Sequence, residues 1–258
     1  MVGVVAEVPF PPDVGEFFPE PVVHGWAPWL TKFPFLVWLA VAIVILFFLI
    51  AYRSPKLVPT RTQWIAESIY GFVRKGIAED VIGPEGVRFA PYLASLFCFI
   101  LVTNMFGLVP GIQMSPNAHI AFPAILALLS WVLYNYVGVR EHGLLKYLKL
   151  SVVPPAPWYM LWLLVPIEIF TTLLMRPFTL ALRLFANMFA GHMILVVFTL
   201  GGFVLANADS VLIRPISLLS WAMAIAMTGL ELLVAVLQAY VFTLLTASYV
   251  SGSLSTEH

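Results

Sequence analysis

Charged residues are scarce in this chain. Only 10% of its 258 residues are Asp, Glu, Lys or Arg, whereas 61% are hydrophobic. Ordinary soluble domains contain roughly 25% charged residues. The 13 basic and 13 acidic residues also cancel, so no net charge attracts the chain to nucleic acid. This composition indicates an integral membrane protein, and we expect no nucleic-acid partner.

Cysteine is almost absent as well. Cys98 is the only one, which excludes an internal disulfide, and its apolar surroundings favour a packed thiol over a redox or metal centre. The patterns GxxxxGK[ST], HExxH and GxSxG do not occur, so nucleotide binding, zinc proteolysis and a serine nucleophile elbow have no support. We therefore expect no cofactor, no metal and no intramembrane enzyme.

Long apolar stretches dominate what remains. Crossing about 30 Å of hydrocarbon takes about 20 helical residues, and three spans of this kind are predicted at 33–52, 89–110 and 118–139. Two longer regions, 157–206 and 211–250, follow. A straight helix of 50 residues would reach about 75 Å, so each region must be strongly tilted, bent or divided. Pro166 and Pro177 permit bends in the first of them.

Two further segments have their own patterns. Residues 1–32 contain several prolines and more acidic than basic residues, which predicts a retained external segment without a fold of its own. In 60–80, apolar residues recur at helical spacing opposite charged ones. This alternation predicts an amphipathic helix on the membrane surface.

Basic residues predict the orientation of the chain. Nine of the 13 Lys and Arg follow the first or the third span, so both connections are expected on the cytoplasmic side. The chain is then a single membrane domain, 1–258, with its N-terminus outside and its C-terminus in the cytoplasm. The N-terminus is not rich in Arg and Ser as a transit peptide is, which favours a bacterial plasma membrane over an organelle.

Polar side chains interrupt the two long apolar regions: Glu168, Arg176, Arg183, Asn187, His192, Glu231 and Gln238. A charge at the bilayer centre costs about 2.5 to 3.5 kcal/mol on insertion scales, so such residues are functional candidates. For Glu168 and Arg176, a position at the membrane interface or a mutual ion pair is as well supported as a functional role. The central arginine has no carboxylate three or four residues away, and a functional role is favoured for it.

Helical geometry groups these side chains. At 100° per residue Arg183 and Asn187 share a face with Arg176. If the two long helices are antiparallel and Gln238 lies level with Arg183, Glu231 comes to within about 3 Å of the level of His192. A His and a carboxylate at one level form either a proton relay or a pair that pins two helices together. The relay is favoured, because a neutral amide pair would pin the helices at a lower desolvation cost.

Arg183 cannot itself relay protons, since a guanidinium stays charged at any accessible pH. It can act as a fixed positive charge that favours the ionised form of a nearby carboxylate. No carboxylate of this chain is well placed for that role. The partner carboxylate is therefore expected on another chain.

At these residues the sequence resembles subunit a of the F-type ATP synthases, the stationary proton-channel subunit of the membrane sector. The resemblance extends from about residue 33 to 250, and three motifs carry it: RPFTLALRLFANMFAGH (176–192), LLVAVLQAYVFTLLTASYV (232–250) and LVTNMFGLVPG (101–111). Ala186 stands where many members have Gly, and Glu168 lies one residue further from Arg183 than in many relatives. The resemblance thus covers all of the predicted spans.

The resemblance implies an all-α integral membrane protein. It would have about five membrane-embedded helices and one amphipathic surface helix, with the last two helices long and strongly tilted around a c-subunit ring. Arg183 matches the essential arginine that faces the carboxylate of the ring. The other implied residues of the proton path are Asn104, Asn187, His192, Glu231 and Gln238, with Glu168 and Arg176 as weaker matches.

The implied partners are the c ring, the b subunits of the peripheral stalk, the rest of the ATP synthase and the lipid membrane. Protons would enter and leave through two offset half-channels, and their flow would drive rotation and ATP synthesis. The main alternative is a sodium-coupled version of the same subunit, because the ring site that selects the ion belongs to another chain. A secondary transporter has only the weak repeat RPFTL (176–180) and RPISL (214–218) in its favour.

Overall fold

The computed structural model describes residues 32–53, 55–109, 112, 114–147, 158–207 and 214–255. In this part of the chain the main helices are α1 (Lys32–Ala51), α2 (Arg61–Val73), α3 (Ala90–Met105), α4 (Ala121–His142), α6 (Trp158–Ile169), α7 (Arg176–Ala206) and α8 (Ile216–Leu254). Five helical stretches are long and apolar enough to cross a membrane. The predicted all-α membrane fold with two long final helices is therefore confirmed.

Several segments predicted from the sequence have a more detailed structure. Two π-helical segments, Arg74–Ile82 and Phe170–Met175, continue α2 and α6. Two 3-10 turns, Pro84–Phe89 and Pro116–Ala118, precede α3 and α4. Apart from Lys32, the predicted external segment 1–32 lies outside the described residues. The orientation and the single-domain division of the chain stay predictions.

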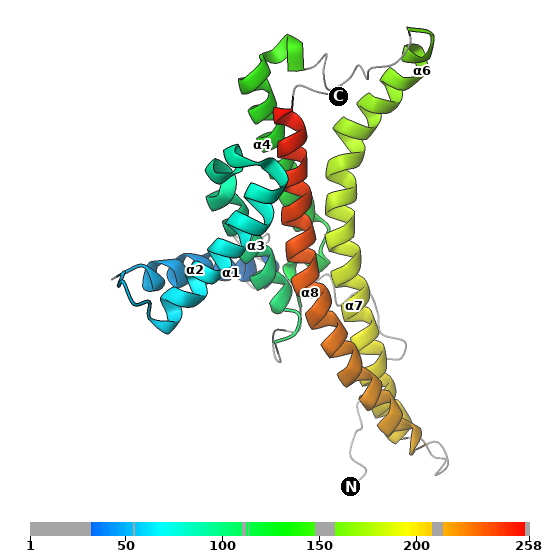
Figure 1. Cartoon of the computed structure of the whole chain (residues 1–258). Coiled ribbons are helices and arrows are strands. Elements are labelled where there is room, and N and C mark those ends of the chain that lie inside the picture. Colours follow the sequence, from blue (N-terminus) through cyan, green and yellow to red (C-terminus); the bar gives the residue numbers. More distant parts are fainter. Residues whose placement is uncertain are drawn as a thin grey trace, which may run out of the picture.

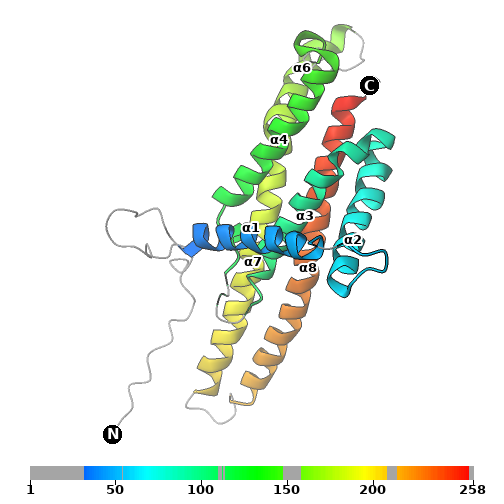
Figure 2. The same ribbon diagram turned by 90° about the vertical axis from the view of Figure 1, so that its left-hand side faces the viewer.

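The helices α7 and α8 are longer than a perpendicular crossing of the hydrocarbon needs. They have 31 and 39 residues, which at 1.5 Å per residue gives about 46 Å and about 58 Å, more than the hydrocarbon thickness. Figure 1 shows α6 and α7 as one curved rod beside α8, and Figure 2 shows α1 running across the direction of this pair. If α1 follows the membrane normal, α7 and α8 lie steeply inclined in the membrane.

The centre of the bundle is α3. Half of its span is buried, against 17% for α1, so α1 is a peripheral helix with most of its surface open to lipid. The main core joins α3 to the π-helical turn after α2 and to α7 and α8. On α8 the packed face contains small residues at helical spacing, including Ala235, Ala239, Thr243 and Ala247. Small residues let helix backbones approach closely, which is how helices associate in lipid.

The pair α7–α8 is antiparallel and in close contact. Ser220 Oγ on α8 donates a hydrogen bond of 2.7 Å to Phe198 O on α7. The rings of Phe203 and Trp221 meet edge to face with centroids 5.6 Å apart. Gly202 lies against the same indole, so closely that a Cβ atom there would overlap it. The two helices are thus fixed in register near the short connection between them.

The amphipathic segment after α1 is present, but it is packed differently from its pattern. Val73 and Ile77 are buried as expected, whereas Trp64, Ile65 and Phe72 are largely exposed. Gln63 is buried instead: its Oε1 accepts from Lys56 N at 3.2 Å, and its Nε2 donates to Lys56 O at 3.2 Å. The amide fixes the connection before α2, and the exposed apolar side chains form the face available to lipid.

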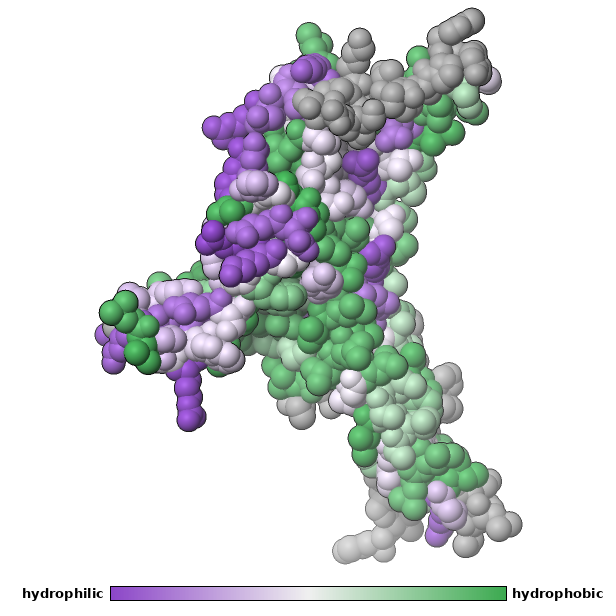
Figure 3. Space-filling model, viewed as in Figure 1, coloured by the Kyte–Doolittle hydropathy of each residue, from purple (hydrophilic) through white to green (hydrophobic). Residues whose placement is uncertain are grey.

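The connections rich in basic residues lie at one end of the molecule. Arg88 Nη2 is 3.1 Å from Glu85 Oε2 and 3.9 Å from Glu141 Oε2, which joins the turn before α3 to the end of α4. In Figure 3 hydrophilic residues gather on the upper left of the molecule, whereas the lower part of α7 and α8 is mainly hydrophobic. Spans α3 and α4 are therefore antiparallel, with the start of α3 beside the end of α4.

The contact at Gly202 predicts a packing defect. Gly202→Ala should destabilise the α7–α8 pair by about 1 to 3 kcal/mol, because the methyl group overpacks against Trp221. Thermal inactivation of the detergent-solubilised assembly measures this loss. The matched control is Gly229→Ala on α8, where an added Cβ has no neighbour within 4 Å. Equal melting temperatures for the two variants would contradict the close contact.

Candidate functional site

Arg183 lies on an exposed face of α7. Ala186, Ala190 and Ile194 follow it on the same face and are also exposed. Within the described part of the chain, Arg183 makes no hydrogen bond and no ion pair. A guanidinium at membrane depth is costly without a counter-charge. The face around Arg183 is therefore suited to receive a carboxylate from another molecule.

Glu231 lies on the other side of the α7–α8 contact and is only 4% exposed. Two glycines make room for its carboxyl group. A Cβ atom on Gly191 would lie 3.2 Å from Glu231 Oε1, and one on Gly107 would lie 3.8 Å from it. Glu231 Oε2 is buried and has no hydrogen-bond partner among the described residues. A buried polar atom without a partner is costly, which marks this carboxyl group as a functional candidate.

A cavity of about 170 Å³ connects the carboxyl group with the exposed face of α7. Asn187, Ala190, Gly191 and Ile194 of α7 line one side, and Met227, Leu230, Glu231 and Val234 of α8 line the other. One water molecule occupies about 30 Å³ of liquid. The cavity has room for several waters, and its polar groups are the Asn187 amide and the Glu231 carboxyl. Arg183 is one helical turn from Asn187, about 6 Å along the axis.

A buried polar network lies on the inner side of Glu231. Asn104 Nδ2 donates to Ala235 O at 3.1 Å, which joins α3 to α8 one turn from Glu231. Asn117 Nδ2 donates to Asn104 Oδ1 at 2.7 Å and to Thr103 Oγ1 at 2.8 Å. The side chains of Thr103, Asn104 and Asn117 are at most 1% exposed. The network extends from the α3–α4 connection to the level of Glu231.

The remaining central candidates fit the predicted register. His192 is half-buried on α7 and directly follows Gly191, so it is at the level of Glu231. Gln238 is buried on α8. Because α7 and α8 are antiparallel and Glu231 lies against Gly191, Gln238, seven residues further along α8, comes to the level of Leu184, which follows Arg183 in the sequence. The structure therefore places one polar level at Glu231 and another near Gln238.

Glu168 and Arg176 form a separate cluster. Arg176 Nη2 is 3.9 Å from Glu168 Oε1, which also accepts a hydrogen bond of 3.1 Å from Thr172 Oγ1. The Arg176 guanidinium lies 5.5 Å from the centre of the Tyr249 ring on α8, within the range of a cation–π contact. Of the two alternatives for this pair, the mutual ion pair is present. These residues do not join the cavity at Glu231.

Sequence reasoning did not find Ser115, Asn117 and the two glycines at Glu231. Ser115 Oγ donates to Thr103 O at 2.9 Å and accepts from Asn117 N at 3.2 Å. The only signal for Ser115 and Asn117 was an uncharged connection between two spans. Within the described ranges, no three His, Cys, Asp or Glu side chains come together as a metal site requires.

Comparison with known proteins gives the family. The family described as ATP synthase A chain matches residues 34–251. "ATP synthase subunit a" of Nocardioides sp. (strain ATCC BAA-499 / JS614) is 44% identical over 95% of this chain and 88% of its own length. The protein of the same name from Parafrankia sp. (strain EAN1pec) is 47% identical over 87% of this chain and 77% of its own length.

A third relative, "ATP synthase subunit a" of Streptomyces lividans, is 38% identical over 87% of this chain and 80% of its own length. Identity of this level over most of both chains, together with the helical membrane fold, is decisive. The chain therefore belongs to the ATP synthase A chain family, as a proton-channel subunit that is not itself catalytic.

Proposed function

We propose that Arg183 and Glu231 have separate roles in the transfer of protons between this chain and a rotating ring of c subunits. One observation carries the proposal. The exposed Arg183 has no partner among the described residues, and a cavity beside it contains the buried carboxyl group of Glu231. The first group supplies a permanent charge, and the second supplies a group that can take up and release a proton.

Glu231 is proposed as the last proton donor before the ring. A proton would enter from the outer side, pass the Asn104–Asn117 network, and reach the level of Glu231 and His192. It would then cross the cavity lined by Asn187 to the exposed face of α7. Carboxylate and imidazole groups at membrane depth are typical of proton relays. The ring carboxyl becomes neutral when it takes the proton, so it can then face lipid at low cost.

Arg183 is proposed to control proton release. An ionised ring carboxylate is held beside the guanidinium, which favours the charged form. A ring subunit that returns after nearly a full rotation would meet this charge and lose its proton to the cytoplasmic half-channel. The same charge repels a proton on a direct route between the half-channels. Gln238, near the level of Leu184, would line the helix opposite Arg183.

We further propose that the chain lies in a bacterial plasma membrane, with the N-terminus outside and the C-terminus in the cytoplasm. Its partners would be the c ring on the exposed face of α7 and α8, the b subunits of the peripheral stalk and the rest of the synthase. The tilt of α7 and α8 supports this arrangement, because two long inclined helices present a continuous face to a curved ring.

Replacing Arg183 by Ala should abolish proton pumping, because the returning ring carboxylate then has no fixed counter-charge. ATP-driven acidification of inverted vesicles measures the effect in the whole synthase. The control is Arg140→Ala, since Arg140 is an exposed cation at the end of α4. Sodium-depleted vesicles distinguish proton coupling, for which wild-type pumping persists. Full pumping by Arg183→Ala would refute the role of Arg183.

Replacing Glu231 by Gln should also slow pumping, by roughly 100-fold or more, which is the usual contribution of a proton-transfer group. Glutamine keeps the size of the side chain but cannot exchange a proton with the ring. Acidification rates of vesicles that contain equal amounts of assembled synthase measure the loss. Glu141→Gln, at the exposed end of α4, is the matched control. If both variants pump at the wild-type rate, Glu231 is only a packing residue.

A further inference from the structure

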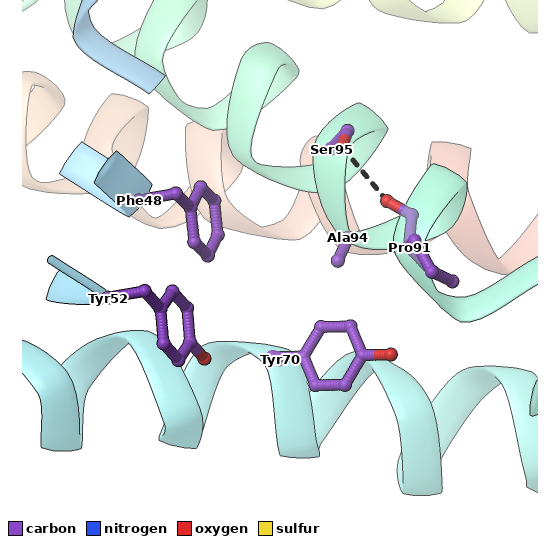
Figure 4. A pocket seen from close by; sticks show the side chains of 6 residues that line it. All are labelled: Phe48, Tyr52, Tyr70, Pro91, Ala94 and Ser95. Carbon is purple, nitrogen blue, oxygen red and sulfur yellow. Dashed lines mark hydrogen bonds between the residues drawn. The ribbon is translucent and has the colours of Figure 1, made fainter. Parts of the chain in front are cut away.

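Two adjoining hollows lie between α1, α2 and α3, away from the α7–α8 face. Their volumes are about 320 and 750 Å³, comparable to the roughly 300 to 1,000 Å³ of small-molecule sites. Phe48, Tyr52 and Ser95 line both hollows, so the two form one groove. Figure 4 shows Phe48 and Tyr52 on one side, Tyr70 below, and Ala94 and Ser95 opposite.

The groove changes from apolar to polar along α1. Val44, Ile45 and Leu49 line its apolar part, and Tyr52 and Arg53 line the part where α1 ends. The rings of Phe48 and Tyr52 are parallel, with centroids 6.4 Å apart. Tyr and Arg at the end of a spanning helix lie at the membrane interface, with the polar tip in the headgroup region. The groove therefore runs from hydrocarbon depth to headgroup depth.

Arg53 places a positive charge in the polar part of the groove, and after burial the Glu67 carboxylate of α2 is the next cause that raises the pKa of the neighbouring Tyr52. Arg53 is exposed, and the described residues offer it no ion pair or hydrogen bond through its side chain. Arg74 and Arg88, in contrast, are paired with Glu79 and Glu85. A basic group beside a spanning helix attracts anionic headgroups. The charge of the groove thus complements a phosphate group.

We propose that this groove binds an anionic phospholipid as a structural ligand. One acyl chain lies along Val44, Ile45 and Leu49, and the phosphate lies at the Arg53 guanidinium. A partner helix along α1 is the competing occupant. It would have to supply an anionic residue at the level of Arg53, whereas every anionic phospholipid presents its charge at this depth. The lipid matches both parts of the groove.

The test uses the intact synthase in phosphatidylcholine vesicles that contain a trace of phosphatidylglycerol with a diazirine in one acyl chain. After irradiation, peptide mass spectrometry identifies the labelled residues. Wild type should be labelled within 44–53 and 91–95, and a phosphatidylcholine probe should label these residues less. Arg53→Gln should lower labelling by phosphatidylglycerol about fivefold, the loss expected for one basic residue at an anionic surface.

Two further variants complete the test. Ser95→Trp should prevent labelling by either probe, because the indole fills the part of the groove common to both hollows. Arg140→Gln removes an equally exposed cation elsewhere and should leave labelling unchanged. ATP-driven pumping at the wild-type rate shows that each variant is assembled, and if Ser95→Trp does not assemble, Arg53→Gln decides alone. Equal labelling of wild type and Arg53→Gln, or a partner helix cross-linked at 44–53, would overturn the proposal.

Discussion

The close contact between α7 and α8 at Gly191 is the constraint on which the site depends. Because Gly191 has no side chain, the Glu231 carboxyl group fits against the backbone of α7 while the helices stay packed. The same contact sets Asn187 and Glu231 on opposite walls of one cavity. A bulkier residue at this point would separate the helices, and the cavity would lose its defined connection to the exposed face with Arg183.

Around this contact, Glu231, which can gain or lose a proton, is buried, whereas Arg183, which stays charged, is exposed. Glu231 is enclosed between α3, α7 and α8, with a hydrogen-bonded network on its inner side. Arg183 is on the outside, where this chain offers it no partner in the described ranges. Asn117 donates to Asn104, and Asn104 donates to the Ala235 carbonyl, so the two amides hold the α3–α4 connection against α8 without adding a charge. The proposed ring carboxylate would offset the cost of this exposed charge at membrane depth.

Much of this was predictable because membrane spans and intramembrane charges have strong sequence signals. Apolar length predicted the five spans, and the excess length of the last two regions predicted that each is tilted, bent or divided. Helical spacing predicted that Glu231 and His192 lie at one level. Asn117 was not predictable, because its importance comes from a contact with Asn104 that only the folded α3–α4 connection creates. Gln63 was missed for a related reason, since its amide pairs with the backbone of Lys56 as well as with the Glu67 carboxylate, and only the folded connection brings Lys56 to it.

The groove between α1 and α3 could not be predicted from the sequence either. Val44, Phe48 and Tyr52 repeat every four residues, as on any apolar helix, and the hollow beside them forms only where α1, α2 and α3 come together. Packing between elements thus determined the features that were missed, whereas local pattern determined those that were found. The central charges were identified because an arginine is rare at membrane depth whatever surrounds it.

The central claim is that Arg183 is the barrier between the two half-channels. Passive proton flux through vesicles that carry the membrane sector, stripped of the catalytic head and with the ring cross-linked to prevent rotation, tests it directly. The account predicts that the wild-type sector is tight and that Arg183→Ala conducts protons without rotation. Equal tightness of the two sectors would mean that the barrier lies elsewhere.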